Sequence, residues 1–307
     1  MTATTREIFE KYEVRKTKKQ KTAFIEYIRG VAEGAGYSVT VEGKKSTRNI
    51  VIGDLSTAKV VFTAHYDTCP VLPFPNFITP KCIALYVLYQ VALVAAFLAV
   101  AFGIGFVAGT VTALLDLGEA VASLSATLIY WVLLILLLAG PANKHTANDN
   151  TSGVTTVVDT MLAMPAQLRG KAAFVLFDQE EVGMFGSSAF AKKHKAEMKE
   201  KLLVNFDCVS DGENILFVLR KGAKAHRSAI EAAFVPTAAC GVEVAEKGVF
   251  YPSDQMNFPC GVGVAALKKT RGGILYMDRI HTRRDTVYCE ENIAFLCGGA
   301  QRLTELL

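Results

Sequence analysis

The chain has 307 residues, which is enough for one large α/β domain or two small ones. Its net charge of +4 is only mildly basic, and no RNA- or DNA-binding motif is present, so nucleic acid is not expected as a partner. Hydrophobic residues make up 51% of the sequence, and most of the excess lies between Ile83 and Gly140.

The N-terminal segment predicts a helix over residues 5–34. Apolar side chains recur there at near-helical spacing, and Gly36 marks the end of the pattern. The basic side chains of this segment are interpreted as a solvated helix face, with anionic lipid headgroups as the alternative partner. They are Arg15, Lys16, Lys18, Lys19 and Lys21. We find no apolar segment here of the kind that a cleavable secretory signal contains.

Three short strand-like segments follow this helix. They are Ser38–Val41, Asn49–Ile52 and Lys59–Ala64. The third runs directly into His65-Tyr66-Asp67, so that a histidine and an aspartate stand at the carboxyl end of a predicted strand.

A long uncharged region comes next. Ile83–Leu115 contains no charged residue, a short polar break holds Asp116 and Glu119, and Val121–Gly140 is again uncharged. Because about 20 apolar residues in a helix span a bilayer core, the sequence predicts a transmembrane helical hairpin over 81–141. The alternative is a buried hairpin in a soluble protein or oligomer, which would need a very large core to cover it.

Charge predicts the orientation of this hairpin. Its connection is acidic and lacks Lys and Arg, whereas Lys81 and Lys144 flank its two ends. By the positive-inside rule, the large domain faces the cytoplasm. Seven cysteines without a CxxC pair agree with this, since an odd number of thiols favours a reducing compartment over a disulfide framework.

Strands and helices alternate after the hairpin. The predicted helices are Thr151–Leu162, Ser187–Lys199, Ala225–Ala233 and Glu290–Leu306, and the predicted strands are Lys171–Phe177, Leu202–Phe206, Asn214–Leu219, Gly263–Leu267 and Gly273–Tyr276. This alternation favours an α/β fold with a mixed, mostly parallel sheet sandwiched by helices. Since residues 1–80 supply strands that the later part needs, we predict one α/β domain from 1–80 and 142–307, interrupted by the hairpin.

Side chains that can bind a metal ion follow several predicted strands or open a neighbouring helix. They are His65, Asp67, Asp149, Glu180, Glu181, Asp207 and His281. In open α/β sheets, sites assemble outside the carboxyl ends of the strands. Two histidines with several carboxylates suit zinc or a similar divalent metal, and one carboxylate that bridges two ions is usual in two-metal hydrolases. Singly, each residue could also be a solvated side chain or a helix cap, but their joint placement favours a site.

The motifs appear in a characteristic order. They are His65-Tyr66-Asp67, Asn148-Asp149-Asn150-Thr151-Ser152-Gly153, Glu180-Glu181, Asp207, and His281-Thr282 with Asp285-Thr286. This order resembles the aminopeptidase-Y-type family of co-catalytic zinc metallopeptidases, which includes bacterial leucyl aminopeptidases and has glutaminyl cyclases as relatives. The resemblance covers residues 37–306, with 81–142 as an insertion. It implies a zinc peptidase, most simply an aminopeptidase, that acts on peptide or amide bonds.

The resemblance also implies two zinc ions per chain and a ligand set for them. Asp149 would bridge the two ions. His65 and Asp207 would complete one site, and Glu181 and His281 would complete the other.

Two further residues would support the chemistry. Glu180 would be the general base that takes a proton from the metal-activated water and hands it to the leaving amine. Asp67 would hydrogen-bond the His65 ring and fix its tautomer. Members of such families often have a cis peptide after the bridging aspartate, here Asp149–Asn150.

The chain departs from the family pattern in two places. The family often has Ser-Asp-His ahead of the last ligand, whereas this chain has Ser253-Asp254-Gln255. The hairpin also replaces what is a short loop in soluble relatives. All five presumed ligands and the base are nevertheless present, which argues against a non-catalytic relative.

Several alternatives stay open at this stage. They are a carboxypeptidase in which Arg283 and Arg284 bind the substrate carboxylate, a lipid-linked amide hydrolase, a glutaminyl-cyclase-like transferase, and a non-catalytic membrane scaffold. The hairpin joins the chain close to His65 and Asp149, so a membrane-derived or hydrophobic substrate is expected as readily as simple anchoring. The sequence leaves the oligomeric state open.

Overall fold

The computed structural model of the chain describes residues 1–43 and 47–307. In this part of the chain, nine strands form one sheet with the order β1-β2-β4-β3-β5-β8-β6-β7, and β9 pairs with β8. The strands are β1 Val39–Glu42, β2 Asn49–Ile52, β3 Val60–His65, β4 Ala172–Phe177, β5 Leu202–Phe206, β6 Asn214–Leu219, β7 Gly241–Ala245, β8 Gly261–Lys269 and β9 Leu275–Tyr276. The central strands β4, β3, β5 and β8 are parallel, whereas β2 and β6 run antiparallel to their central neighbours. The expected mixed, mostly parallel α/β fold is confirmed.

Helices cover both faces of this sheet. Helices α1 (Ala3–Tyr12), α2 (Lys18–Gly34), α5 (Gly153–Ala163), α7 (Arg227–Ala233) and α8 (Glu290–Leu306) contribute to one core cluster, and α6 (Phe185–Lys193) contributes to the other. Neighbouring residues of a strand point to opposite faces of the sheet. Phe62 belongs to the core cluster under α1, α2, α5, α7 and α8, and Val61 belongs to the cluster under α6. Because both faces are covered, every residue of β3, β4 and β5 is buried.

The predicted single helix over residues 5–34 is two helices. Thr17 begins α2 with a reciprocal cap, in which its hydroxyl accepts from the Gln20 N–H and its own N–H donates to the Gln20 side chain. The break before Thr17 turns Arg15 inward, and its guanidinium donates to the Tyr66 carbonyl at 2.5 Å and to Thr151 Oγ1 at 3.1 Å.

The interpretation of the basic N-terminal residues as a solvated face is therefore wrong for two of them. Arg15 is fully buried, and Lys21 is buried in an ion pair with Asp178. Both cations lie on the core side, where they join the first segment of the chain to β3 and to the end of β4. Arg15 and Lys21 thus connect the α1–α2 segment to the edge of the sheet where the predicted site residues lie.

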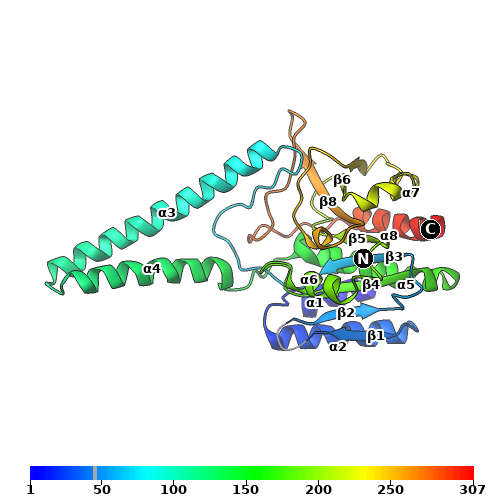
Figure 1. Ribbon diagram of the computed structural model, residues 1–307, viewed down its shortest axis with the longest axis horizontal. Coiled ribbons are helices and arrows are strands. Elements are labelled where there is room, and N and C mark those ends of the chain that lie inside the picture. Colours follow the sequence, from blue (N-terminus) through cyan, green and yellow to red (C-terminus); the bar gives the residue numbers. More distant parts are fainter. Residues whose placement is uncertain (44–46) are drawn as a thin grey trace.

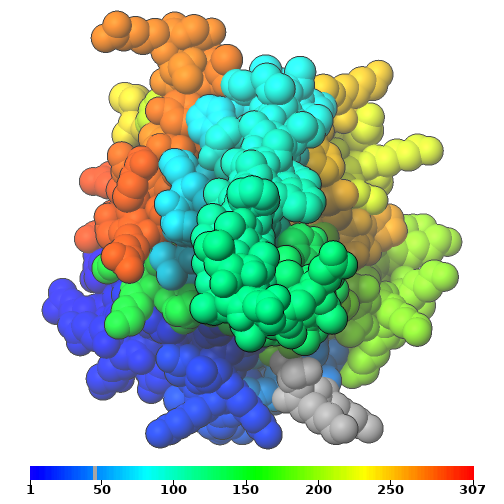
Figure 2. Space-filling model, turned by 90° about the vertical axis from the view of Figure 1, so that its left-hand side faces the viewer, coloured from blue at the N-terminus to red at the C-terminus, as the bar shows by residue number. Residues whose placement is uncertain are grey.

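The long apolar region forms α3 (Ile83–Leu114) and α4 (Glu119–Ala139), which extend together away from the rest of the molecule (Figure 1). Viewed along its length, the hairpin stands in front of the body (Figure 2). Both helices are long and apolar enough to cross a bilayer. Of the most hydrophobic 18-residue stretch of each helix, only 11% in α3 and 0% in α4 is buried. Exposed apolar surface of this extent marks an interaction surface rather than a water-facing one.

Candidate metal centre

The predicted site residues stand at one edge of the sheet. His65 ends β3, Glu180 and Glu181 follow β4, and Asp207 follows β5. These strands are parallel neighbours, so their carboxyl ends meet at the same edge. Asp149 lies in the turn over Ala147–Ser152 before α5, and His281 lies after β9; both reach the same place.

The five predicted metal ligands gather around one centre. His65 Nε2 lies 3.3 Å from Asp149 Oδ1 and 3.6 Å from Asp207 Oδ1. His281 Nε2 lies 2.9 Å from Asp149 Oδ2 and 3.1 Å from Glu181 Oε2. The two oxygens of Asp149 thus face two different clusters, which is the arrangement that a carboxylate shared by two ions requires.

The Asp149 segment is fixed by side chains on both sides. Asp285 accepts from the backbone N–H groups of Asn148 at 2.7 Å and Asp149 at 2.9 Å. The Asn150 amide donates to the Phe206 carbonyl at 3.0 Å, and the Asp149–Asn150 peptide is cis, as the resemblance implied. These contacts connect Asp149, the predicted bridging residue, to the end of β5 and to the segment after His281.

Gly153 makes this close approach possible. A Cβ atom there would lie 2.3 Å from both Asn150 Oδ1 and the Phe206 carbonyl oxygen, so only glycine fits. The glycine that ends the Asn148–Gly153 motif is therefore a packing requirement of the turn that carries Asp149.

Asp67 lies beside the His65 ring. Its Oδ1 lies 3.5 Å from His65 Nδ1, longer than an ordinary hydrogen bond, and that buried ring nitrogen has no hydrogen-bond partner among the described residues. The role of Asp67 in orienting the His65 ring therefore stays a prediction. Instead, Asp67 accepts from the backbone N–H groups of Glu180 at 3.0 Å and Glu181 at 3.3 Å, so it positions the predicted base and a predicted ligand together.

His281 is held in an uncommon backbone conformation. Its φ of 60° lies in the left-handed region, which costs a non-glycine residue free energy. The Leu72 N–H donates to the His281 carbonyl at 2.7 Å and stabilises this conformation. The segment that leads into the hairpin thus helps to aim the last predicted ligand.

The electrostatics of the site favour a cation. Burial lowers the pKa of His65 and His281, yet the carboxylates that face them raise both pKa values well above the ordinary histidine range. Burial also raises the pKa of Glu180 well above its usual value. One buried carboxylate oxygen of Glu181 has no hydrogen-bond partner in the described part of the chain. A set of two imidazoles and three carboxylates suits zinc as ligands, and the Glu181 oxygen without a hydrogen-bond partner is available to bind it.

Several residues around this centre received no role in the site from the sequence. Arg15 looked like a surface cation, and nothing in its spacing indicated burial. Asp254 is fully buried with neither carboxylate oxygen hydrogen-bonded among the described residues, and burial raises its pKa to about 7. Gln255, at the position where the family often has histidine, donates to the Tyr251 carbonyl at 2.7 Å and accepts from Asn205 at 3.3 Å.

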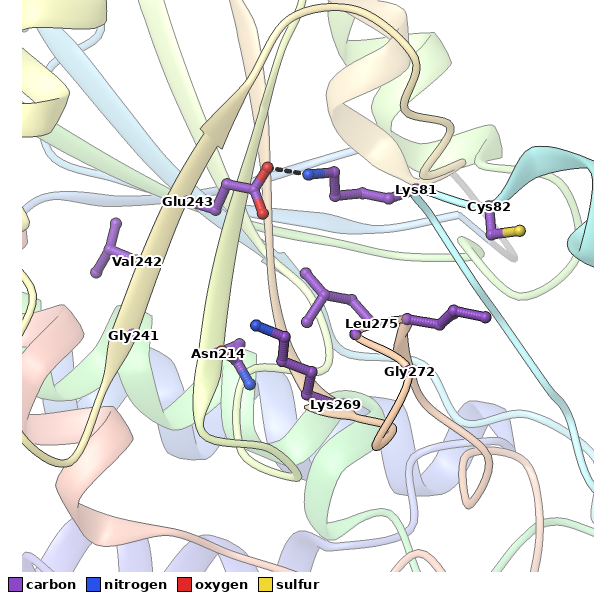
Figure 3. Close-up of a pocket in the computed structure, with 11 residues that line it drawn as sticks. Lys81, Cys82, Asn214, Gly241, Val242, Glu243, Lys269, Gly272 and Leu275 are labelled. Carbon is purple, nitrogen blue, oxygen red and sulfur yellow. Dashed lines mark hydrogen bonds and ion pairs between the residues drawn. The ribbon is translucent and has the colours of Figure 1, made fainter.

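Three cavities lie near the attachment of the hairpin. One of about 630 Å³ is lined by Lys81, Asn214, Glu243 and Lys269, and none of the predicted site residues lines it (Figure 3). The segment Val71–Phe74 lines both of the others. Leu93, Phe97 and Leu136 line the first of these, an apolar cavity of about 500 Å³ against α3 and α4. Thr282, Arg283 and Arg284 line the second, a cavity of about 550 Å³ beside His281.

Comparison with known proteins places this geometry in a family. No curated protein matches the chain. Among solved structures, glutaminyl cyclase from Porphyromonas gingivalis aligns over 99% of this chain and 95% of its own, with 15% identity and a TM-score of 0.60. LapA aminopeptidase from Legionella pneumophila aligns over 98% and 67%, with 13% identity and a TM-score of 0.56. A Zn-dependent exopeptidase from Parabacteroides distasonis aligns over 99% and 96%, with 14% identity and a TM-score of 0.55.

These structures share the fold. The sequence itself carries the stronger result, because residues 49–293 match peptidase family M28. This span contains strands β2 to β9, all five predicted ligands and the hairpin. The chain therefore belongs to peptidase family M28.

Proposed function

We propose that the protein is a membrane-anchored peptidase that holds two zinc ions per chain and removes amino-terminal residues from peptides. The observation that carries this proposal is the placement of Asp149, whose two oxygens face His65 with Asp207 on one side and His281 with Glu181 on the other. Membership of peptidase family M28 supports peptide-bond hydrolysis.

The residues of the chain divide the chemistry between them. When bound, two zinc ions lower the pKa of a water molecule and polarise the scissile carbonyl. Glu180 takes the proton of the attacking water and passes it to the leaving amine. Asp67 accepts from the N–H groups of both Glu180 and Glu181, so base and ligand keep a fixed relation. Burial raises the pKa of Glu180 well above its usual value, the charge of His65 opposes this rise, and Asp207 and Asp254 add to it.

We also propose that the large domain faces the cytoplasm and that the substrate is apolar and membrane-associated. The hairpin begins and ends beside the site, because Pro70 and Ala142 form a bridge close to the ligands. The apolar cavity against α3 and α4 shares Val71–Phe74 with the cavity beside His281. An apolar side chain or acyl chain that lies along the hairpin would therefore place its polar end next to the metal centre.

Metal analysis and a substrate series test these proposals. Purified full-length protein in detergent should contain two zinc ions per chain and release amines from aminoacyl amides. It should prefer apolar peptides in vesicles over equally apolar soluble amides. Equal turnover of both would reduce the hairpin to an anchor, and preference for lipid-linked amides over peptides would make the enzyme a lipid-amide hydrolase. Protein free of zinc and inactive after zinc addition would reject the enzyme assignment in favour of a scaffold.

A glutaminyl-cyclase-like transferase is the second candidate, because a glutaminyl cyclase aligns with nearly the whole chain. That reaction needs one tightly held zinc rather than a hydrolytic pair, so metal stoichiometry separates the two. Carboxypeptidase action receives less support. Arg284 forms an ion pair with Asp278 at 2.8 Å, which leaves Arg283 in the cavity beside Thr282 as the candidate for a substrate carboxylate.

A further inference from the structure

The cluster around His281 contains a thiol that the motif pattern does not include. Sγ of Cys69 and one ligand atom each of Asp149, Glu181 and His281 all lie within 4.8 Å of one another. Tetrahedral ligands that lie about 2.0–2.3 Å from a zinc ion are about 3.3–3.8 Å from one another. The four side chains are thus close enough together to hold a single ion.

Two observations distinguish this thiol from an ordinary buried cysteine. Cys69 is fully buried, and within residues 1–43 and 47–307 its sulfur has no hydrogen-bond partner. The Cys208 thiol, also near the centre, instead donates to Asp207 Oδ1 at 3.1 Å. Independently, Glu181, whose side chain is 4% exposed, has one oxygen without a hydrogen-bond partner in the same described residues. A sulfur and a carboxylate oxygen without partners therefore belong to the same small cluster.

The backbone fixes Cys69 in this place. The Asn143 N–H donates to the Cys69 carbonyl at 3.0 Å, and Pro70 forms a bridge with Ala142. On the other side, the Arg15 N–H donates to Thr68 Oγ1 at 2.9 Å. The thiol is thus held between β3 and the end of the hairpin.

We propose that Cys69 is a fourth protein ligand of the ion held by Asp149, Glu181 and His281, bound through its sulfur. This inference rests on the proposed metal centre. On metal binding, the thiol gives up its proton to solvent and coordinates as thiolate.

The proposal makes the two ion sites unequal. The Cys69 site has four protein ligands, whereas the site of His65, Asp149 and Asp207 has three and so leaves more room for water or substrate. A thiolate also favours zinc and other soft ions over magnesium or manganese. The Cys69 site should therefore fill first and hold its ion more tightly, while the second ion exchanges.

A cobalt titration of metal-free, full-length protein in detergent tests this directly. A sulfur-to-cobalt charge-transfer absorption in the near ultraviolet should grow with the first equivalent of cobalt and then stop growing. Cys69→Ser should lose this absorption and bind the first ion at least about tenfold more weakly. Cys240→Ser is the matched control, because Cys240 is buried beside Asn292 and away from the ligands, and it should keep both properties.

Each other result has a defined meaning. Wild-type protein that binds two cobalt ions without the absorption overturns the role of Cys69 and leaves the proposed function intact. An absorption that persists in Cys69→Ser overturns it too, and its loss in Cys208→Ser would assign the sulfur to Cys208. Protein that binds no metal rejects the metal centre itself. Should Cys69→Ser not fold, X-ray absorption of wild-type protein with one zinc decides: sulfur at about 2.3 Å supports the proposal, and only nitrogen and oxygen scatterers overturn it.

Discussion

Replacement of Glu180 by glutamine separates proton transfer from metal binding. Glutamine has the same size and keeps the backbone N–H that donates to Asp67 at 3.0 Å, so the loop after β4 should keep its conformation. The amide cannot accept the proton of the attacking water. A lost general base typically costs about 10²–10⁴-fold in rate. At about 1.36 kcal/mol per tenfold, the activation free energy should rise by about 2.7–5.4 kcal/mol.

The assay compares kcat on an aminoacyl amide with the zinc content of the same sample. Glu180→Gln should lose turnover and keep its zinc, with a thermal midpoint close to that of the wild type. Glu181→Gln, one residue further on, is the matched control: its carboxylate lies 3.1 Å from His281 Nε2, so this variant should lose zinc as well as activity. A Glu180→Gln enzyme that retains a third or more of the wild-type kcat would show that another group takes the proton.

Three further changes test the supports of the site. Arg15→Ala should lower the free energy of unfolding by about 3 kcal/mol because buried acceptors lose their donors, while exposed Lys19→Ala should be nearly neutral in the same denaturant titration. Gly153→Ala should cost about 1–3 kcal/mol and reduce zinc content through its clash, whereas Gly30→Ala, with open space around its Cβ, should not destabilise. Burial raises the pKa of Asp159, so the folded state binds a proton more readily than the unfolded one, and its ionisation destabilises the fold as pH rises above about 3.9. Asp159→Asn should therefore raise the thermal midpoint at pH 7, and this gain should disappear toward pH 4.

The sequence predicted those parts of the fold in which burial alone fixes the structure. Strands β2, β5 and β6 and helix α8 have the predicted bounds, because each is a short apolar run or a regular amphipathic pattern between clear breaks. Strand β7 was not predicted. It lies at the edge of the sheet and is only half covered, with Glu243 in its middle, so its sequence has neither strict alternation nor a continuous apolar run.

The site divides in the same way. The five predicted ligands could be singled out because each follows a predicted strand or precedes a helix and because the resemblance implied the set. Parallel strands bring His65, Glu181 and Asp207 together. Arg15, Asp254 and Cys69 could not, because their burial depends on contacts with segments far away in the chain. A lone cysteine has no spacing pattern, and a buried arginine in a basic stretch has the same sequence signal as an exposed one.

The position of the hairpin explains how a peptidase fold can accept two long helices without losing its site. The chain leaves the site at Pro70 and returns at Ala142, and these two residues form a bridge. The Val71 N–H also donates to the Pro141 carbonyl at 2.9 Å, so the roots of the hairpin are closed like those of a short loop. Helices α3 and α4 lie outside this closed root, so their presence does not need to move the predicted ligands. The same closure fixes the root of the hairpin next to Cys69 and His281, so insertion of α3 and α4 into a bilayer would bring the metal centre to the membrane surface.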